Sequence, residues 1–177
     1  MKTVLSLISI LLMSFSSQEA HYPTPKTKHL LFYIQRTHNA NTIVYDANFD
    51  ENGILDTENP VKAYWIRFAE KGQKMPLRSY ERWMAYGIKA KKEEKSPYDY
   101  RLYLSASSKV KLWLKQTGPY QAEVITIIDG KPAKLERMFA TLDESGWIPK
   151  VKYGEFFGYD LATGKKAYQK VFPKDIK

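Results

Sequence analysis

The sequence contains no cysteine among its 177 residues, and this absence removes several kinds of chemistry at once. A disulfide framework, thiol catalysis and a lipidated amino-terminal cysteine are all excluded. Histidine is also scarce, because the chain has only His21, His29 and His38. None of the three has a second candidate ligand at metal-binding spacing. The two shortages argue against a zinc site and against a nucleophile activated by an imidazole base.

Long hydrophobic runs are absent apart from one, which occupies residues 4–15 and follows Lys2. A positive start, a short apolar run and small residues near Ser16 or Ala20 are typical of a cleavable export signal. The run is shorter than the roughly 20 apolar residues that span a bilayer, so cleavage is favoured over anchoring. Residues 1–20 are therefore predicted to be a signal peptide, and the mature protein is predicted to be periplasmic or secreted.

The rest of the chain has the length of one domain, without an internal repeat. Residues 21–29 are polar and contain Pro23 and Pro25, which favours an extended leader. Residues 30–177 form the predicted β-rich domain. Runs with alternating polarity, rich in branched and aromatic residues, predict its strands. They span residues 30–34, 42–45, 61–68, 88–92, 98–104, 109–115, 121–128, 133–141, 151–159 and 166–172.

One segment has helical spacing instead of strand alternation. Leu77, Tyr80 and Met84 recur at helical intervals within residues 76–86, and Gly87 follows them. We therefore expect one short helix there, with these three side chains facing the core.

Short connections dominate the predicted order of strands. Asp129-Gly130 is a two-residue hairpin signal, and Thr163-Gly164 marks another reversal. Adjacent strands joined in this way form an antiparallel meander. A closed or nearly closed barrel of the calycin or lipocalin kind is favoured over a two-sheet sandwich, because nearly all connections are local.

Polar and aromatic side chains gather near the ends of the first three predicted strands. Arg67 shares a strand face with Trp65, and Arg36 ends the first strand. Guanidinium groups beside an aromatic wall suit a pocket for an anionic or polar small molecule. The structural alternatives are a buried ion pair between Arg36 and Asp46 and plain surface exposure of these side chains. The ligand-binding candidates are Arg36, Asn39, Asn41, Tyr45, Asn48, Tyr64, Trp65, Arg67 and Arg82.

Residues 48–59 resemble part of a calcium-binding loop. Oxygen-bearing side chains alternate at Asn48, Asp50, Asn52 and Asp56, and Gly53 supplies a turn residue. Asn48 stands where such loops begin with aspartate, and Asn59 stands where a bidentate glutamate closes the ligand shell. The favoured interpretation is a long turn stabilised by its Asx residues, with calcium as the alternative.

The net charge of +9 bears on the choice of partner. A basic surface attracts anionic headgroups and glycans, although spread charge also serves solubility. We expect no nucleic-acid partner. The basic strand at residues 109–115 is a candidate for docking on envelope components or for peripheral contact with a membrane. Glu81 and Asp99 are the carboxylates considered for glycan hydrolysis, but nothing in the sequence fixes their separation.

Four segments together resemble a known family. Residues 32–36, 39–48, 60–66 and 81–87 are similar to the domain-of-unknown-function 4833 family of exported bacterial proteins. The resemblance implies export and a single domain, and it brings no activity or catalytic residue with it.

These observations favour an exported β-barrel protein that binds a polar or anionic small molecule, such as a lipid headgroup or a glycan fragment, without covalent chemistry. An envelope scaffold is the first alternative and a glycan-directed hydrolase is the second. No cofactor is expected apart from the calcium alternative.

Overall fold

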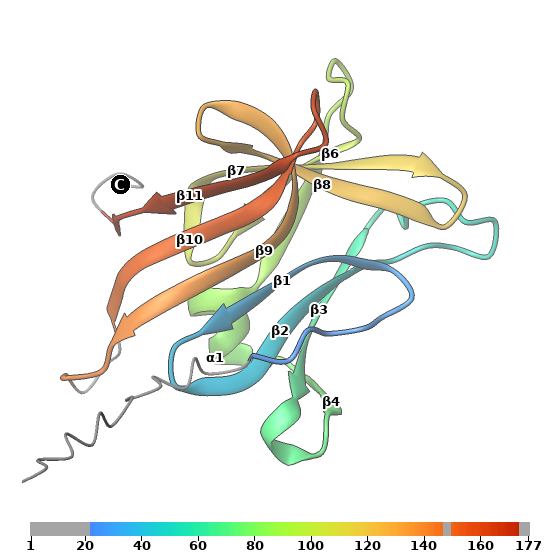
Figure 1. Ribbon diagram of the computed structural model, residues 1–177. Coiled ribbons are helices and arrows are strands. Elements are labelled where there is room, and N and C mark those ends of the chain that lie inside the picture. The colour runs from blue at the N-terminus through green and yellow to red at the C-terminus, as the bar shows by residue number, and fades with distance from the viewer. Residues whose placement is uncertain (1–21, 147–149, 174–177) are drawn as a thin grey trace, which may run out of the picture.

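The computed structural model describes residues 22–146 and 150–173 (Figure 1). The predicted signal peptide lies outside these residues. The strands are β1 (Leu30–Arg36), β2 (Asn39–Ala47), β3 (Val61–Arg67), β4 (Gln73–Pro76), β5 (Ile88–Lys92), β6 (Tyr100–Leu104), β7 (Ser107–Gly118), β8 (Gln121–Ile128), β9 (Lys131–Asp143), β10 (Lys150–Asp160) and β11 (Lys166–Val171). Each of them except β4 overlaps a predicted strand, so the expectation of a mostly β protein is confirmed.

The strands form one curled sheet with the order β4-β3-β2-β1-β9-β8-β7-β6-β5. Consecutive strands pair antiparallel in two runs, β1 to β4 and β5 to β11. The described strands contain one parallel pair, in which Tyr33 to Arg36 of β1 run beside Arg137 to Ala140 of β9. One edge of β9 is thus shared by β8 and β1, while β10 covers the other edge.

The curl brings β3 close to β5, which confirms a barrel-like architecture. β4 and β5 nevertheless lie at the two ends of the hydrogen-bonded order. The molecule is therefore a half-barrel with mixed strand pairing, and the continuous closure of a calycin barrel is not seen among the described strands.

The main core fills the inside of the curl. Phe32 and Tyr45 stack there with ring centroids 4.3 Å apart, and buried leucines of β6, β7 and β9 surround them. Leu55, from the loop after β2, is part of this core at one end, and Leu77 is part of it at the other. A smaller cluster lies on the other face of β1, β2 and β3, since strand residues alternate between faces.

Residues 22–29 cross the outer face of β1 without forming a strand. Pro25 is buried, and the buried Gln35 Nε2 donates a hydrogen bond to the carbonyl oxygen of Pro23 at 3.0 Å. Thr27 Oγ1 and Tyr64 Oη both donate to Asp46, which fastens the segment to β2 and β3. The segment therefore forms a raised border along β1.

The helical segment differs from its prediction. It consists of α1 (Ser79–Glu81) and a single π-helical stretch, η2 (Arg82–Tyr86), and a short 3-10 helix, η1 (Phe68–Glu70), precedes β4. Leu77 is buried as expected, but Tyr80 and Met84 are 57% and 59% exposed, so their predicted core packing is wrong. Both side chains lie on the outer side of this short segment, which faces solvent. No helix in the described parts of the chain has the length and apolar character needed to cross a membrane.

Candidate functional site

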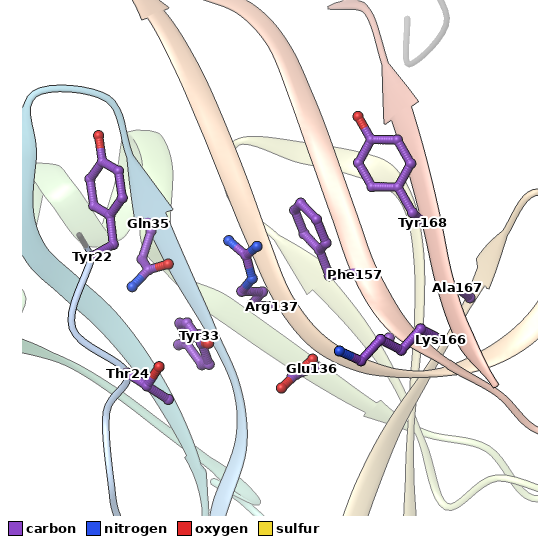
Figure 2. Close-up of a pocket in the computed structure, with 11 residues that line it drawn as sticks. Tyr22, Thr24, Tyr33, Gln35, Glu136, Arg137, Phe157, Lys166, Ala167 and Tyr168 are labelled. Atoms are coloured by element: carbon purple, nitrogen blue, oxygen red, sulfur yellow. The ribbon is translucent and has the colours of Figure 1, made fainter. Parts of the chain in front are cut away.

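A groove of about 630 Å³ lies on the outer face of the sheet (Figure 2). The leader and β1 border it on one side, and β10 and β11 border it on the other. Its lining residues come from the leader, β1, β9, β10 and β11, and they are Tyr22, Thr24, Tyr33, Gln35, Glu136, Arg137, Phe157, Gly158, Lys166, Ala167 and Tyr168.

The pairing register builds the floor of this groove. Tyr33 of β1 pairs with Arg137 of β9, Arg137 with Phe157 of β10, and Phe157 with Tyr168 of β11. Residues that pair directly lie on the same face of a sheet. One row across four strands therefore presents a phenol, a guanidinium, a phenyl ring and a second phenol side by side.

A β-bulge in β9 adds a second charged residue to the groove. Phe157 pairs with Arg137, whereas the next residue of β10, Gly158, pairs with Leu135, so that Glu136 is the extra residue. Leu135 is buried, Glu136 is exposed and Arg137 is partly exposed. The bulge interrupts the alternation of faces and directs both Glu136 and Arg137 outward.

Arg137 is held in place without being neutralised. Its guanidinium carbon lies 3.7 Å from the centroid of the Phe157 ring. Within the described residues, no carboxylate lies at ion-pair distance from it and no hydrogen bond engages it. Cation–π stacking fixes the plane of the guanidinium and leaves its N–H donors free for a ligand.

The two walls carry tyrosines. Tyr22 packs edge-on against Phe139 with ring centroids 5.0 Å apart, which places its ring above the β1 side of the groove. On the opposite wall, Tyr168 Oη donates to Glu155 Oε1 at 2.7 Å, and this bond raises the pKa of Tyr168. Both rings are therefore anchored.

The charges are arranged unevenly along the groove. Glu136 and Lys166 lie toward one end, whereas Arg137 lies between the two tyrosine walls (Figure 2). Burial raises the pKa of Tyr33 on the floor, and the hydroxyl of Thr24 and the charge of Arg137 oppose this rise. The groove thus offers two basic side chains, one acidic side chain and three phenols.

The structure brings several of the sequence-predicted site residues together elsewhere, at the helical end of the half-barrel. The guanidinium carbons of Arg36 and Arg67 each lie 5.4 Å from the centroid of the Trp65 ring. Arg36 Nη1 donates to Tyr86 Oη at 3.2 Å, and Arg67 forms an ion pair with Glu70 at 3.2 Å. The Nε atoms of both arginines are buried and have no hydrogen-bond partner in the described parts.

Arg36, Trp65, Arg67 and Tyr86 are called the Trp65 cluster below. Hydrogen bonds to neighbouring residues hold this cluster in place. Trp65 is buried, and its Nε1 donates to Glu81 Oε2 at 3.1 Å. Tyr45 donates to the backbone oxygen of Tyr86 at 2.8 Å. Burial raises the pKa of both phenols, with Arg36 opposing the rise at Tyr86. The cluster ties the helical segment to β1, β2 and β3.

The remaining predicted ligand-binding residues are engaged separately. Asn39 and Asn41 side-chain oxygens accept backbone amides, and Arg82 donates to the Leu77 carbonyl. Tyr64 binds Asp46, and Asn48 donates to the Asn59 carbonyl.

The predicted ion pair between Arg36 and Asp46 is absent, because the antiparallel register pairs Arg36 with Asn39 and Leu30 with Asp46. The two side chains therefore lie at opposite ends of the hairpin.

The calcium-loop candidates use their oxygens on the loop itself. Asp50 Oδ1 accepts the amides of Asn52 and Ile54, and Asp56 Oδ1 accepts those of Glu58 and Asn59. No group of three or more metal-binding side chains occurs in the part of the chain that the structure describes. The geometry is that of successive Asx turns.

The two carboxylates considered for hydrolysis also serve local structure. Glu81 Oε2 accepts Trp65 Nε1 and the Arg78 amide, and Asp99 Oδ2 accepts the Gln116 amide. Neither residue lines the groove.

The groove residues were not among the predicted site residues, although one feature of the sequence pointed to them. Residues 135–138 read Leu-Glu-Arg-Met, which places two charged residues between apolar ones inside a predicted strand. A break of this kind in the period of two is the mark of a bulge. The contribution of Tyr22 had no such signal, because it depends on where the leader packs.

The fold and the groove together define a β half-barrel whose outer face carries an open recess lined by aromatic rings and a stacked guanidinium. The chain belongs to the domain-of-unknown-function family DUF4833, whose model matches residues 32–170. This confirms the resemblance seen in the sequence, and the match includes the strands of the groove but not Tyr22 or Thr24. No curated protein and no solved structure matches the chain.

Proposed function

We propose that the protein is a non-catalytic binding protein that holds a small acidic sugar, such as a glycan fragment bearing a carboxylate, in the groove of Figure 2. The observation that carries this proposal is the stacked and unpaired guanidinium of Arg137. Arginine forks bind carboxylates and phosphates in a bidentate manner, and a fork held in place loses little conformational freedom on binding.

The walls favour a ring-shaped ligand over a simple anion. Tyr22 and Tyr168 stand on opposite sides of Arg137, with anchored rings. Aromatic rings that are apolar on their faces and polar at one tip suit the mixed surface of a sugar ring. An acyclic headgroup such as glycerol phosphate would meet Arg137 but would leave the walls unused.

Glu136 supports a defined orientation of the ligand. Its carboxylate would repel an acidic group at its own end of the groove and would accept hydrogen bonds from hydroxyl groups. The acidic group of the ligand therefore binds at Arg137, and its hydroxyls face Glu136 and Lys166.

The proposal includes a location outside the cytoplasm, because the first 20 residues have the pattern of a cleavable signal. Intact-mass measurement on protein recovered from a periplasmic extract tests this. Loss of the first 16 to 20 residues is expected, and a full-length mass in that fraction would argue against cleavage.

Calorimetric titration tests the binding proposal, with digalacturonic acid, neutral digalactose and glycerol phosphate as probes. Wild-type protein should bind digalacturonic acid in preference to both others, and Arg137→Met should weaken this binding by about tenfold or more, since a bidentate charged contact contributes about 1.5–3 kcal/mol.

Arg101 provides the matched control. Its guanidinium carbon lies 4.5 Å from the Trp113 ring centroid, so it is also a stacked arginine, but it lies outside the groove. Arg101→Met should leave binding unchanged. Equal losses in the two variants, or a preference for glycerol phosphate, would contradict the acidic-sugar proposal.

A further inference from the structure

The end of the half-barrel that carries α1 and η2 presents an apolar surface to solvent. Tyr80, Trp83 and Met84 are 57%, 80% and 59% exposed. Positions three and four apart in a helical segment lie on one side of it, so these side chains form one patch. Leu77 and Tyr86 point to the core instead and hold the segment in place.

The charged residues near this patch in the sequence are mostly positive. Residues 71–89 contain Lys71, Lys74, Arg78, Arg82 and Lys89, and Glu81 is the one acidic residue among them. Glu81 accepts hydrogen bonds from Trp65 Nε1 and from the Arg78 amide, so its carboxylate is occupied. Arg78 and Arg82 are exposed beside the apolar side chains.

We propose that this patch docks the protein on an anionic lipid surface. An exposed tryptophan, a tyrosine and a methionine, with arginines beside them, match the chemistry of a membrane interface. The apolar side chains would enter the headgroup region while the cations meet lipid phosphates, and the overall charge of +9 adds a long-range attraction. The inference is independent of the sugar-binding groove, which lies on the outer face of β1, β9, β10 and β11.

Sedimentation of the mature chain with vesicles tests the proposal. Vesicles of phosphatidylglycerol and phosphatidylcholine in equal parts should bind the protein, and pure phosphatidylcholine should bind it weakly. The double variant Trp83→Ser with Met84→Ser should lower the partition coefficient by about tenfold or more, because it removes most of the apolar area that would enter the lipid. Arg78→Gln with Arg82→Gln should weaken binding and reduce its dependence on salt.

Two controls identify the surface that binds. Leu161→Ser changes an exposed apolar residue in the turn after β10 and should have no effect. Lys109→Gln with Lys111→Gln removes two exposed charges of β7 and should leave the apolar contribution intact. Absence of binding to the anionic vesicles would overturn the proposal, as would a larger loss in the β7 variant than in the Trp83 and Met84 variant.

Hydrogen exchange of the wild-type chain gives an answer that does not depend on the variants folding. Slower exchange of residues 79–86 in the presence of the anionic vesicles supports docking through the patch. Protection of residues 109–115 alone would contradict docking through the patch. Protection of neither segment would contradict it as well.

Discussion

At the scale of single residues, the groove depends on a glycine in β10. A Cβ atom at Gly158 would lie 2.2 Å from the backbone oxygen of Lys134 and 3.1 Å from Ile128 Cδ1. The bulge in β9 brings this backbone close, and a side chain at position 158 would force the two strands apart.

We therefore expect Gly158→Ala to lower the free energy of unfolding by about 1–3 kcal/mol, as overpacking does. Gly154→Ala in the same strand is the matched control, because the nearest atom to its Cβ would be 3.5 Å away. Urea denaturation compares the two variants. Equal effects would show that the close approach at position 158 does not restrict the strand pair.

Tyr45 links the core to the behaviour of the protein at alkaline pH. Burial raises the pKa of its phenol well above the ordinary value of 10.0. The unfolded chain therefore releases this proton at a pH where the folded chain retains it. The stability that depends on the neutral phenol is present below pH about 10 and is lost as pH rises toward the folded-state pKa.

Two effects are expected for Tyr45→Phe. Near neutral pH the substitution should lower the free energy of unfolding by about 0.5–1.5 kcal/mol, because the hydrogen bond to the Tyr86 carbonyl is lost. Its stability should also fall less steeply than that of the wild type between pH 9 and 11, as followed by denaturation at each pH. Parallel stability curves would contradict the assignment of this titration to Tyr45.

At the scale of elements, the leader is the part of the groove wall that belongs to no strand and is held to the sheet by side-chain contacts. Gln35 is 2% exposed and connects β1 to the leader through the carbonyl of Pro23. Tyr22 belongs to the leader and forms part of the groove wall on the β1 side, so its position depends on how the leader packs.

Gln35→Ala should loosen the leader while leaving the sheet folded, because the main core lies on the other face of β1. Limited proteolysis should then cut within residues 22–28 several-fold faster than in the wild type. The exposed Gln121→Ala is the control and should be cut at the wild-type rate. Equal cleavage rates in the two variants would show that Gln35 does not hold the wall.

Most strands were predictable because alternation is local and a buried face demands it. β4 was not, since all its residues are exposed and carry no apolar pattern. The parallel pairing of β1 with β9 joins segments about a hundred positions apart, and no local signal encodes such a register. The helical spacing of Tyr80 and Met84 was correctly detected, but periodicity does not reveal whether a covering element exists for that side.

The sequence predicted the kinds of residue in the candidate site but not its location. Arginines beside aromatic rings were expected, and Arg36 and Arg67 do lie beside Trp65. The groove, however, is formed by Arg137, Phe157 and Tyr168, whose proximity requires four strands in register and one bulge.

At the scale of the whole molecule, the half-barrel separates two kinds of surface. The outer face of β1, β9, β10 and β11 carries the groove, and the end with α1 and η2 carries the exposed aromatic patch. A protein seated on a membrane by that patch would keep its groove open to the surrounding solution.

The proposed function requires the ligand to bind at Arg137 and not at the Trp65 cluster. Titration of the isotope-labelled mature chain with digalacturonic acid, followed by amide NMR, tests it most directly. We expect saturable shifts at residues 22–24, Gln35, Arg137, Phe157 and Tyr168, which Arg36→Met with Arg67→Met leaves in place. Shifts centred on Arg36, Trp65 and Arg67, or no shifts at all, would contradict binding at Arg137.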